Sequence, residues 1–267
     1  MASSTVTLAR GPQGLADIWA RELPQKDNLC GCFWGAVVLA AGGIDGLDQD
    51  AVALAAGTTL PDGDPAEFVP EGETPRRDYR VQLPPAKDAR ASGTAASALA
   101  GAIERLAGGT LSALPVAGVW SASSVEGLVE IVAEAAPEAA LLANLRTGLL
   151  WGSRPDPRLL LSHVAGEDVE APPAEWDTGH FLNLAGMLRG PARALLLVRD
   201  SYPRLGWRGY HFQPAEALAR ALERGDGREG GVLCIAGPAS ARALGRELAA
   251  AGYELRHWDN GTPPRGG

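Results

Sequence analysis

An apolar stretch at residues 33–41 (FWGAVVLAA) constrains the fold most strongly. It contains no proline and is followed by Gly42 and Gly43, a pattern that predicts a helix ending at the glycines. Because no side of this helix is polar, we expect the helix to be buried. The chain has 267 residues, of which 46% are hydrophobic, so it can form a large core around the helix.

Hydrophobic periodicity and turn residues predict further helices and strands along the chain. The predicted helices cover residues 14–23, 48–56, 92–106, 124–135, 214–224 and 239–251. The predicted strands cover residues 111–120, 181–188, 194–199, 231–236 and 253–258, and residues 139–145 form either a strand or a short helix. Because a turn at 189–191 follows the strand at 181–188 and the next strand begins at 194, these two strands should form an antiparallel hairpin.

These elements predict an α+β fold in which the buried helix packs against an antiparallel sheet. We expect a single domain over residues 1–267. Pro, Gly, Asp and Glu dominate residues 58–94, which predicts a loop-rich excursion with a short strand at 79–83. Residues 259–267 are expected to form a polar tail.

Composition argues against several classes of function. The net charge of −8 and the pI of about 5.1 argue against binding to nucleic acid or to an anionic membrane surface. No apolar run approaches the length of a membrane span, and residues 1–14 lack the apolar segment of a signal peptide. The chain has three cysteines, and two of them are too close together for a disulfide framework, so a reducing compartment, the cytoplasm, is expected.

A short polar loop, residues 25–29, leads into the buried helix at Cys30. A thiol in the first turn of a helix lies at the positive end of the helix dipole, which favours the reactive thiolate. Gln25, a few residues upstream, can donate its side-chain amide to an oxyanion formed above the sulfur. Cys32 is an alternative nucleophile in the same turn, and either thiol needs a histidine from elsewhere in the chain. The competing interpretation is that these free cysteines are inert packing residues.

His180 has the most suggestive setting of the four histidines. It directly precedes the first strand of the predicted hairpin, and Asp200 directly follows the second strand. In an antiparallel hairpin, the residue that starts one strand lies near the residue that ends its partner, so His180 and Asp200 should meet. A carboxylate bonded to one ring nitrogen leaves the other nitrogen to take the proton of a thiol.

The order glutamine, cysteine, histidine and aspartate resembles that of the papain-like cysteine peptidases. Residues 198–210 (VRDSYPRLGWRGY) look like the Asn-Ser-Trp-Gly…Trp-Gly…Gly-Tyr segment of that family. The pair Cys30-Gly31, with the helix that follows it, is most similar to the branch whose peptidase domains cut double-glycine leader peptides. The resemblance covers residues 24–43 and 177–210, and it departs from the papain pattern in the spacing from Gln25 to the cysteine and in the position of Trp34.

The resemblance implies a papain-like α+β fold and a thioacyl-enzyme that hydrolyses or transfers a peptide or amide bond. It assigns the nucleophile to Cys30, the base to His180, the orientation of that base to Asp200 and the oxyanion donor to Gln25. It also implies that the substrate site is lined or shielded by Trp34, Trp176 and Trp207. The expected partner is a peptide or amide substrate, and neither a cofactor nor a metal is expected.

Two other functions remain open from the sequence. A papain-like fold without activity would bind a peptide or a protein partner. A metal site could use Cys30, Cys32, His180 and His211, although their spacing matches no common zinc pattern.

Overall fold

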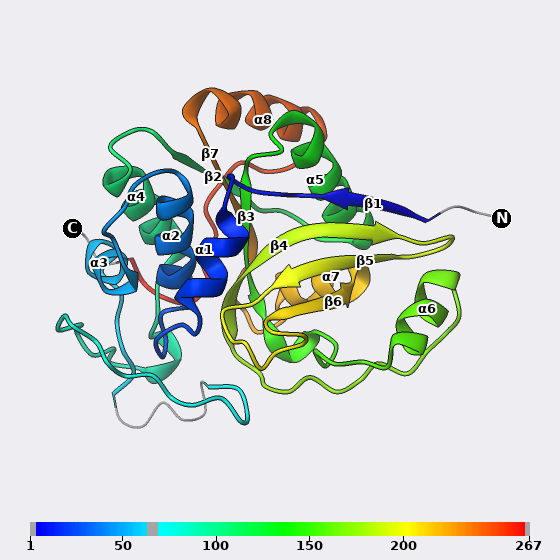
Figure 1. Ribbon diagram of the computed structural model, residues 1–267, viewed down its shortest axis with the longest axis horizontal. Helices are drawn as coiled ribbons and strands as arrows, with labels where there is room; N and C mark the ends of the chain where they lie inside the picture. The colour runs from blue at the N-terminus through cyan, green and yellow to red at the C-terminus, as the bar shows by residue number, and fades with distance from the viewer. Residues whose placement is uncertain (1–3, 63–68, 265–267) are drawn as a thin grey trace.

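The computed structural model describes residues 4–62 and 69–264, in which helices pack on both faces of one seven-stranded sheet (Figure 1). The strand order is β2-β7-β3-β4-β5-β6, with β1 paired to β4, and each of these pairings is antiparallel. The strands are β1 (Thr5–Leu8), β2 (Ser112–Val116), β3 (Ala140–Arg146), β4 (Gly179–Arg189), β5 (Ala194–Arg199), β6 (Tyr210–Pro214) and β7 (Gly231–Ala236). The predicted α+β class and the predicted β4–β5 hairpin are confirmed.

The helices form two layers that share the sheet between them (Figure 1). One layer contains α1 (Leu15–Glu22), α2 (Cys30–Ala41), α3 (Gln49–Ala55) and α4 (Ala96–Leu106). The other contains α5 (Ala122–Ala135), α7 (Ala215–Glu223) and α8 (Pro238–Ala250). The remaining short helices are η2 (Ala89–Ala91), η3 (Thr147–Leu149) and α6 (Pro157–Ala165), the last of which packs beside β5.

The central strand β3 shows why both layers are needed. Successive side chains of a strand point to opposite faces of the sheet. Leu141 and Ala143 join the core cluster of α5, α7 and α8, whereas Ala140 and Leu142 join the cluster of α2 and α4. All four side chains are fully buried, so β3 is apolar on both faces and is covered on both.

The apolar helix α2 is buried, as its composition predicts. Every residue from Gly31 to Leu39 is shielded from solvent. Gly31 allows the helix to approach the sheet closely, because a Cβ at this position would lie 3.1 Å from Leu99 and 3.2 Å from Phe181. Phe181 follows His180 in β4, so this close approach brings the start of α2 next to the start of β4.

Several predicted elements are wrong. Residues 79–83 form no strand, because this segment bonds to the loop before α2 and to α3 instead of to a sheet. Residues 253–258 form only an isolated bridge between Ala117 and Glu254. The strands β1 and β6 were not predicted. Parts of the predicted excursion and tail, residues 63–68 and 265–267, lie outside the described residues, as do residues 1–3.

The described part of the predicted polar tail packs onto the protein. Asn260 and Thr262 are largely buried. The Asn260 amide donates to the Thr94 carbonyl at 3.0 Å, and the Thr262 hydroxyl donates to the Ser92 carbonyl at 3.1 Å. The end of the chain therefore covers the segment that leads into α4. Among the described residues, none of the helices combines the length and apolar character required to cross a membrane.

Candidate active site

Cys30 is the first residue of α2 and is partly exposed at the wall of a cavity. The residue before the helix is Leu29, whose side chain does not cap the first turn. The free N–H groups of this turn therefore point toward the end of the helix where the thiol lies, and they favour a negative charge there.

His180 and Asp200 meet, as the hairpin pattern predicts. His180 lies near the start of β4, and Asp200 directly follows β5. His180 Nε2 is 3.1 Å from Asp200 Oδ1, and the two side chains are 1% and 2% exposed. The backbone around Asp200 is also held, because Trp19 Nε1 donates to the Asp200 carbonyl at 2.8 Å. Since Nε2 faces the carboxylate, Nδ1 is the nitrogen left for the thiol.

The electrostatics of this pair favour an imidazolium beside a carboxylate. Burial lowers the pKa of His180, but the charge and hydrogen bond of Asp200 outweigh burial and raise that pKa well above its ordinary 6.5. A hydrogen bond with the Cys30 side chain acts in the same direction. Burial raises the pKa of Asp200, but the charges and hydrogen bonds of His180 and His211 hold it well below 3.8. The positive His180 ring therefore lies where it can stabilise a thiolate on Cys30.

A second histidine, His211 on β6, was missed as a partner of Asp200. Its Nε2 lies 3.7 Å from Asp200 Oδ2. Gln213 Nε2 lies 3.1 Å from His211 Nδ1 and can only donate, so the proton of a neutral His211 is on Nε2, toward Asp200. The buried carboxylate is thus flanked by two imidazoles. The sequence signal was weak, because β6 was not predicted and its pairing with β5 alone places His211 here.

Cys32 and Cys234 lie outside the cavity. Cys32 is fully buried, and its sulfur is 3.2 Å from Thr58 Oγ1 and 3.3 Å from Thr94 Oγ1. Burial raises the pKa of Cys32 to about 11 and that of Cys234 to about 12. All three cysteines lie in the described part of the chain, and of these Cys30 alone lines the cavity. The geometry therefore favours Cys30 over Cys32 as a nucleophile.

Gln25 and Asn28 both line the cavity, but only one has a free donor. Gln25 Nε2 donates to the Tyr202 hydroxyl at 3.0 Å and to the Lys26 carbonyl at 3.3 Å, so both of its hydrogens have acceptors. Asn28 Nδ2 is buried and has no hydrogen-bond partner among the described residues. Asn28 also has a φ of 61°, a backbone conformation that asparagine tolerates better than most residues. The oxyanion role predicted for Gln25 therefore fits Asn28 better.

The three tryptophans predicted to line or shield the site have different environments. Trp176 lines the cavity and makes an edge contact with the His180 ring at 5.1 Å between centroids. Trp34 is fully buried in the core of α2, so its predicted role at the substrate site is wrong. Trp207 is 48% exposed and does not line the cavity. The tryptophans that contact the His180–Asp200 pair are Trp176, at the His180 ring, and Trp19, at the Asp200 carbonyl.

The cavity has a volume of about 530 Å³, within the range typical of small-molecule sites. Its wall is formed by the loop before α2, the start of β4, the segment before α4 and the C-terminal segment. Besides His180, the charged residues of the wall are Arg90, Arg146, Asp177, Arg224, Asp226 and Arg228. Arginines outnumber aspartates four to two here, although the whole chain carries a net charge of −8.

The sequence matches DUF6885, a family of unknown function, over residues 9–259. The chain belongs to DUF6885. The matched range runs from the residue after β1 to the C-terminal segment, so it includes every cavity residue named above except Asn260 and Thr262. No curated protein matches this DUF6885 sequence.

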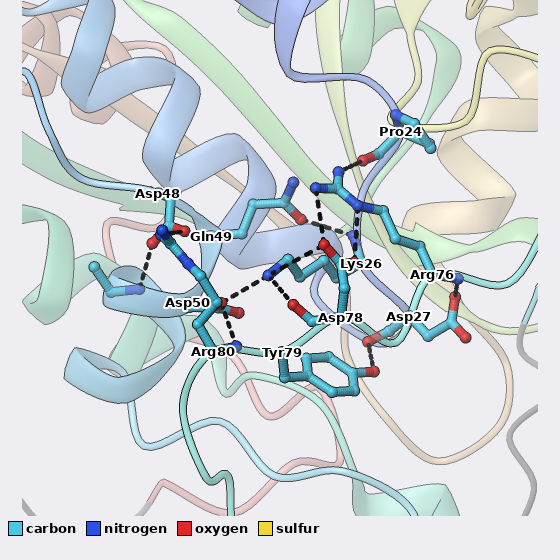
Figure 2. Close-up of polar contacts among 11 residues, drawn as sticks. Pro24, Lys26, Asp27, Asp48, Gln49, Asp50, Arg76, Asp78, Tyr79 and Arg80 are labelled. Atoms are coloured by element: carbon cyan, nitrogen blue, oxygen red, sulfur yellow. Dashed lines mark hydrogen bonds and ion pairs between the residues drawn. The ribbon is translucent and has the colours of Figure 1, made fainter.

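The loop that carries Gln25 and Asn28 in this DUF6885 protein is fixed by a buried ion pair (Figure 2). Lys26 Nζ lies 2.7 Å from Asp50 Oδ2, and the two side chains are 4% and 2% exposed. The Lys26 N–H donates to Gln49 Oε1 at 2.7 Å, which ties the loop backbone to α3 as well. Asp50 also accepts from the Arg80 N–H at 2.8 Å.

Hydrogen bonds from residues 76–80 also hold the loop before α2 (Figure 2). The N–H of Arg76 donates to Asp27 Oδ1 at 2.9 Å, and its guanidinium donates to the Pro24 carbonyl at 2.6 Å. The Tyr79 hydroxyl donates to the Asp27 carbonyl at 2.7 Å. This part of the predicted loop-rich excursion therefore holds the loop that leads into Cys30. Within the residues that the structure describes, no group of three or more His, Cys, Asp or Glu side chains could hold a metal ion.

Proposed function

We propose that this protein is a papain-like cysteine enzyme that hydrolyses or transfers a peptide or amide acyl group through a thioacyl intermediate. The observation that supports this most directly is the placement of Cys30, at a helix N-terminus, beside a buried His180–Asp200 pair on the wall of one cavity. The sequence resemblance to the papain-like peptidases supports the same assignment. The free thiols fit a reducing compartment, so we place the protein in the cytoplasm.

In the proposed reaction Cys30 is first the nucleophile and then the leaving group, and His180 first donates a proton and then accepts one. The Cys30 thiolate attacks the substrate carbonyl carbon, forming a C–S bond and an oxyanion. The oxyanion accepts hydrogen bonds from the backbone N–H of Cys30 and from Asn28 Nδ2. The His180 imidazolium gives its proton to the leaving nitrogen as the C–N bond breaks. Water, an amine or another thiol, deprotonated by the now neutral His180, then displaces Cys30 from the thioester.

Trapping of the acyl-enzyme tests the proposal. The protein is incubated with a panel of peptide and amide probes, quenched in acid, and digested for mass spectrometry. We expect an acyl adduct on the peptide that contains Cys30. Absence of any adduct, together with iodoacetamide labelling of Cys30 no faster than that of a free thiol, would favour an inactive fold that binds a peptide or partner.

The pH dependence of Cys30 alkylation should depend on Asp200. In Asp200→Asn the carboxylate that raises the His180 pKa is gone, while burial still lowers that pKa, so the ring becomes neutral near pH 7. The thiolate then loses its positive partner. We expect iodoacetamide to label Cys30 about tenfold or more slowly between pH 5.5 and 7, because each pKa unit changes the charged population tenfold. Above about pH 9 the two rates should converge.

Asp168→Asn is the matched control for this experiment. It also removes one carboxylate, but the Asp168 side chain is fully exposed and pairs with Arg193, away from the cavity wall. Its alkylation profile should follow that of the wild-type protein. An unchanged profile in Asp200→Asn would mean that the His180–Asp200 pair is only structural.

The two candidate oxyanion donors can be separated by substitution. Asn28→Gly removes the free amide and keeps a residue that tolerates positive φ. Loss of one oxyanion donor typically lowers kcat by about 10²–10³. We expect this loss in Asn28→Gly on any probe that acylates Cys30, with iodoacetamide labelling retained because alkylation forms no oxyanion.

Gln25→Ala provides the comparison. Its amide hydrogens already have acceptors, so we expect a smaller loss of kcat than in Asn28→Gly. A larger loss in Gln25→Ala than in Asn28→Gly would return the oxyanion role to Gln25.

A further inference from the structure

Arg224 is a buried arginine that its neighbours leave partly unsatisfied. Its side chain is 1% exposed, although the residue directly follows α7 and lines the cavity. Nε lies 3.3 Å from Asp226 Oδ1, and Nη2 lies 3.2 Å from Asp226 Oδ2. Nη1 is buried and has no hydrogen-bond partner among the described residues. A buried donor without an acceptor is costly, and such groups in native proteins often mark a functional role.

The backbone at Arg224 is held in a strained conformation. Arg224 has φ 63° and ψ −49°, and the Gly225 N–H donates to the Glu223 carbonyl at 2.8 Å. This is a γ-turn with positive φ at its centre, a rare and strained arrangement for a residue with a side chain. This turn changes the direction of the chain directly after α7, and Arg224 at its centre places its guanidinium in the cavity wall.

The guanidinium lies beside Gly179, the residue that precedes the proposed catalytic histidine in β4. A Cβ built on Gly179, the residue before His180, would lie 3.2 Å from both Nη1 and Nη2 of Arg224. Any side chain at Gly179 would therefore meet the guanidinium. Arg224, His180 and Cys30 line the same cavity, so an anion on Nη1 would share that cavity with the proposed catalytic pair.

The charges around the cavity favour an anion. Arg146 is already paired with Asp177 through both oxygens, at 2.7 and 2.5 Å. Asp226 uses its two oxygens on the Nε and Nη2 edge of Arg224 and leaves Nη1 free for another acceptor. Arg90 and Arg228 add two more positive charges to the wall. A planar guanidinium with a free N–H is well suited to a carboxylate or phosphate oxygen.

We infer that Arg224 binds an anionic oxygen group of the substrate, a carboxylate or a phosphate, close to the bond that Cys30 attacks. This inference rests on the proposed function and adds the substrate class. The substrate is a small amide or peptide with an acidic group near the scissile bond. A neutral peptide would offer Nη1 only a carbonyl oxygen, which forms a weaker hydrogen bond with a guanidinium than a carboxylate or phosphate oxygen does.

Three alkylating probes of the same length test the inference. Chloroacetyl-glycine carries a carboxylate, chloroacetyl-aminomethylphosphonate carries a phosphonate, and chloroacetyl-glycinamide is neutral. Each forms a C–S bond with Cys30 and releases chloride, so the reaction needs no other reactant. The measured quantity is the labelling rate of Cys30 with each anionic probe divided by the rate with the neutral probe, at constant ionic strength.

We expect at least one anionic probe to label wild-type Cys30 about tenfold or more faster than the neutral probe, as for a charge-assisted hydrogen bond. In Arg224→Gln the ratio should fall to about one. Arg224→Lys, which keeps the charge but loses the planar fork, should give an intermediate ratio. Arg242→Gln, an exposed position on α8, removes the same charge away from the cavity and should keep the wild-type ratio. The preferred probe identifies the class of anion.

A wild-type ratio near one, or a high ratio that Arg224→Gln does not lower, would overturn the inference. If none of the probes labels Cys30 faster than a free thiol, the proposed function fails. Anion binding by Arg224 is then tested separately, by thermal unfolding. Phosphate or succinate should raise the melting temperature of the wild-type protein relative to sodium chloride, and of Arg224→Gln by less. Equal shifts in both proteins would reject the anion site. Should Arg224→Gln not fold, Arg224→Lys replaces it, and a labelling ratio or thermal shift equal to that of the wild-type protein would then overturn the inference.

Discussion

A Cys30→Ala variant should lose all turnover of any probe that acylates the wild-type enzyme, while Cys32→Ala should retain most of it. Cys30 is partly exposed in the cavity wall, beside His180, and alanine there leaves no nucleophile. Cys32 packs in the core against two threonine hydroxyls, so its loss should affect stability and not chemistry. The measurement is kcat/KM of both variants, with circular dichroism to confirm that each one folds.

The size of the loss in a third variant distinguishes a catalytic group from a structural pair. Asp200→Ala should reduce turnover by up to a few orders of magnitude and leave residual activity, because Asp200 orients His180 and does not itself react. Equal and mild losses in Cys30→Ala and Asp200→Ala would indicate a structural pair. An active Cys30→Ala protein with an inactive Cys32→Ala protein would transfer the nucleophile to Cys32.

Asp50→Ala should lower the free energy of unfolding by about 3–5 kcal/mol, the usual cost of removing one partner of a buried ion pair. Lys26 and Asp50 are almost completely buried, and Asp50 also accepts the Arg80 N–H. Without the carboxylate, the buried ammonium keeps the Asp78 carbonyl at 2.7 Å and loses its close negative charge. Urea denaturation followed by circular dichroism measures the change.

The neighbouring Asp78 is the matched control. Its carboxylate lies 3.9 Å from the same Lys26 Nζ, but its side chain is 62% exposed. Asp78→Ala should therefore change stability by about 0–1 kcal/mol. The double variant Lys26→Met with Asp50→Leu should recover much of the loss, because it removes both buried charges together. A small effect in Asp50→Ala would mean that the loop before α2 does not depend on this pair.

Predictions from local sequence were accurate where an element carries its own signal. Helix α2 was identified because its apolar run ends at two glycines, and the β4–β5 hairpin because a short segment with a turn at 189–191 separates two apolar runs. Strand β1 has four residues, and its partner β4 lies about 180 positions later in the chain, so no local pattern identifies it. Residues 253–258 alternate as a strand would, but the Tyr253 hydroxyl bonds to the Ser124 carbonyl and Trp258 packs against Gly231.

The residues of the candidate site also differ in whether a local sequence pattern indicates them. Cys30, His180 and Asp200 could be proposed from one helix start and one hairpin. Arg224 and His211 reach the site through tertiary packing of α7 and β6, which no spacing in the sequence indicates. Trp34 and Trp207 were assigned by analogy with a family pattern, but the packing of α2 buries one and the turn before β6 exposes the other.

The close approach of Gly31 to Phe181 has a consequence for the polypeptide before it folds. Cys30 and His180 come from separate layers, a helix and a sheet strand some 150 positions apart, and only docking of the two layers creates the thiol–imidazole pair. An incomplete chain, such as one still emerging from the ribosome, carries an ordinary cysteine with no base beside it. The reactivity that we propose for Cys30 therefore depends on closure of the core, because the thiol lies beside the imidazole only in the folded protein.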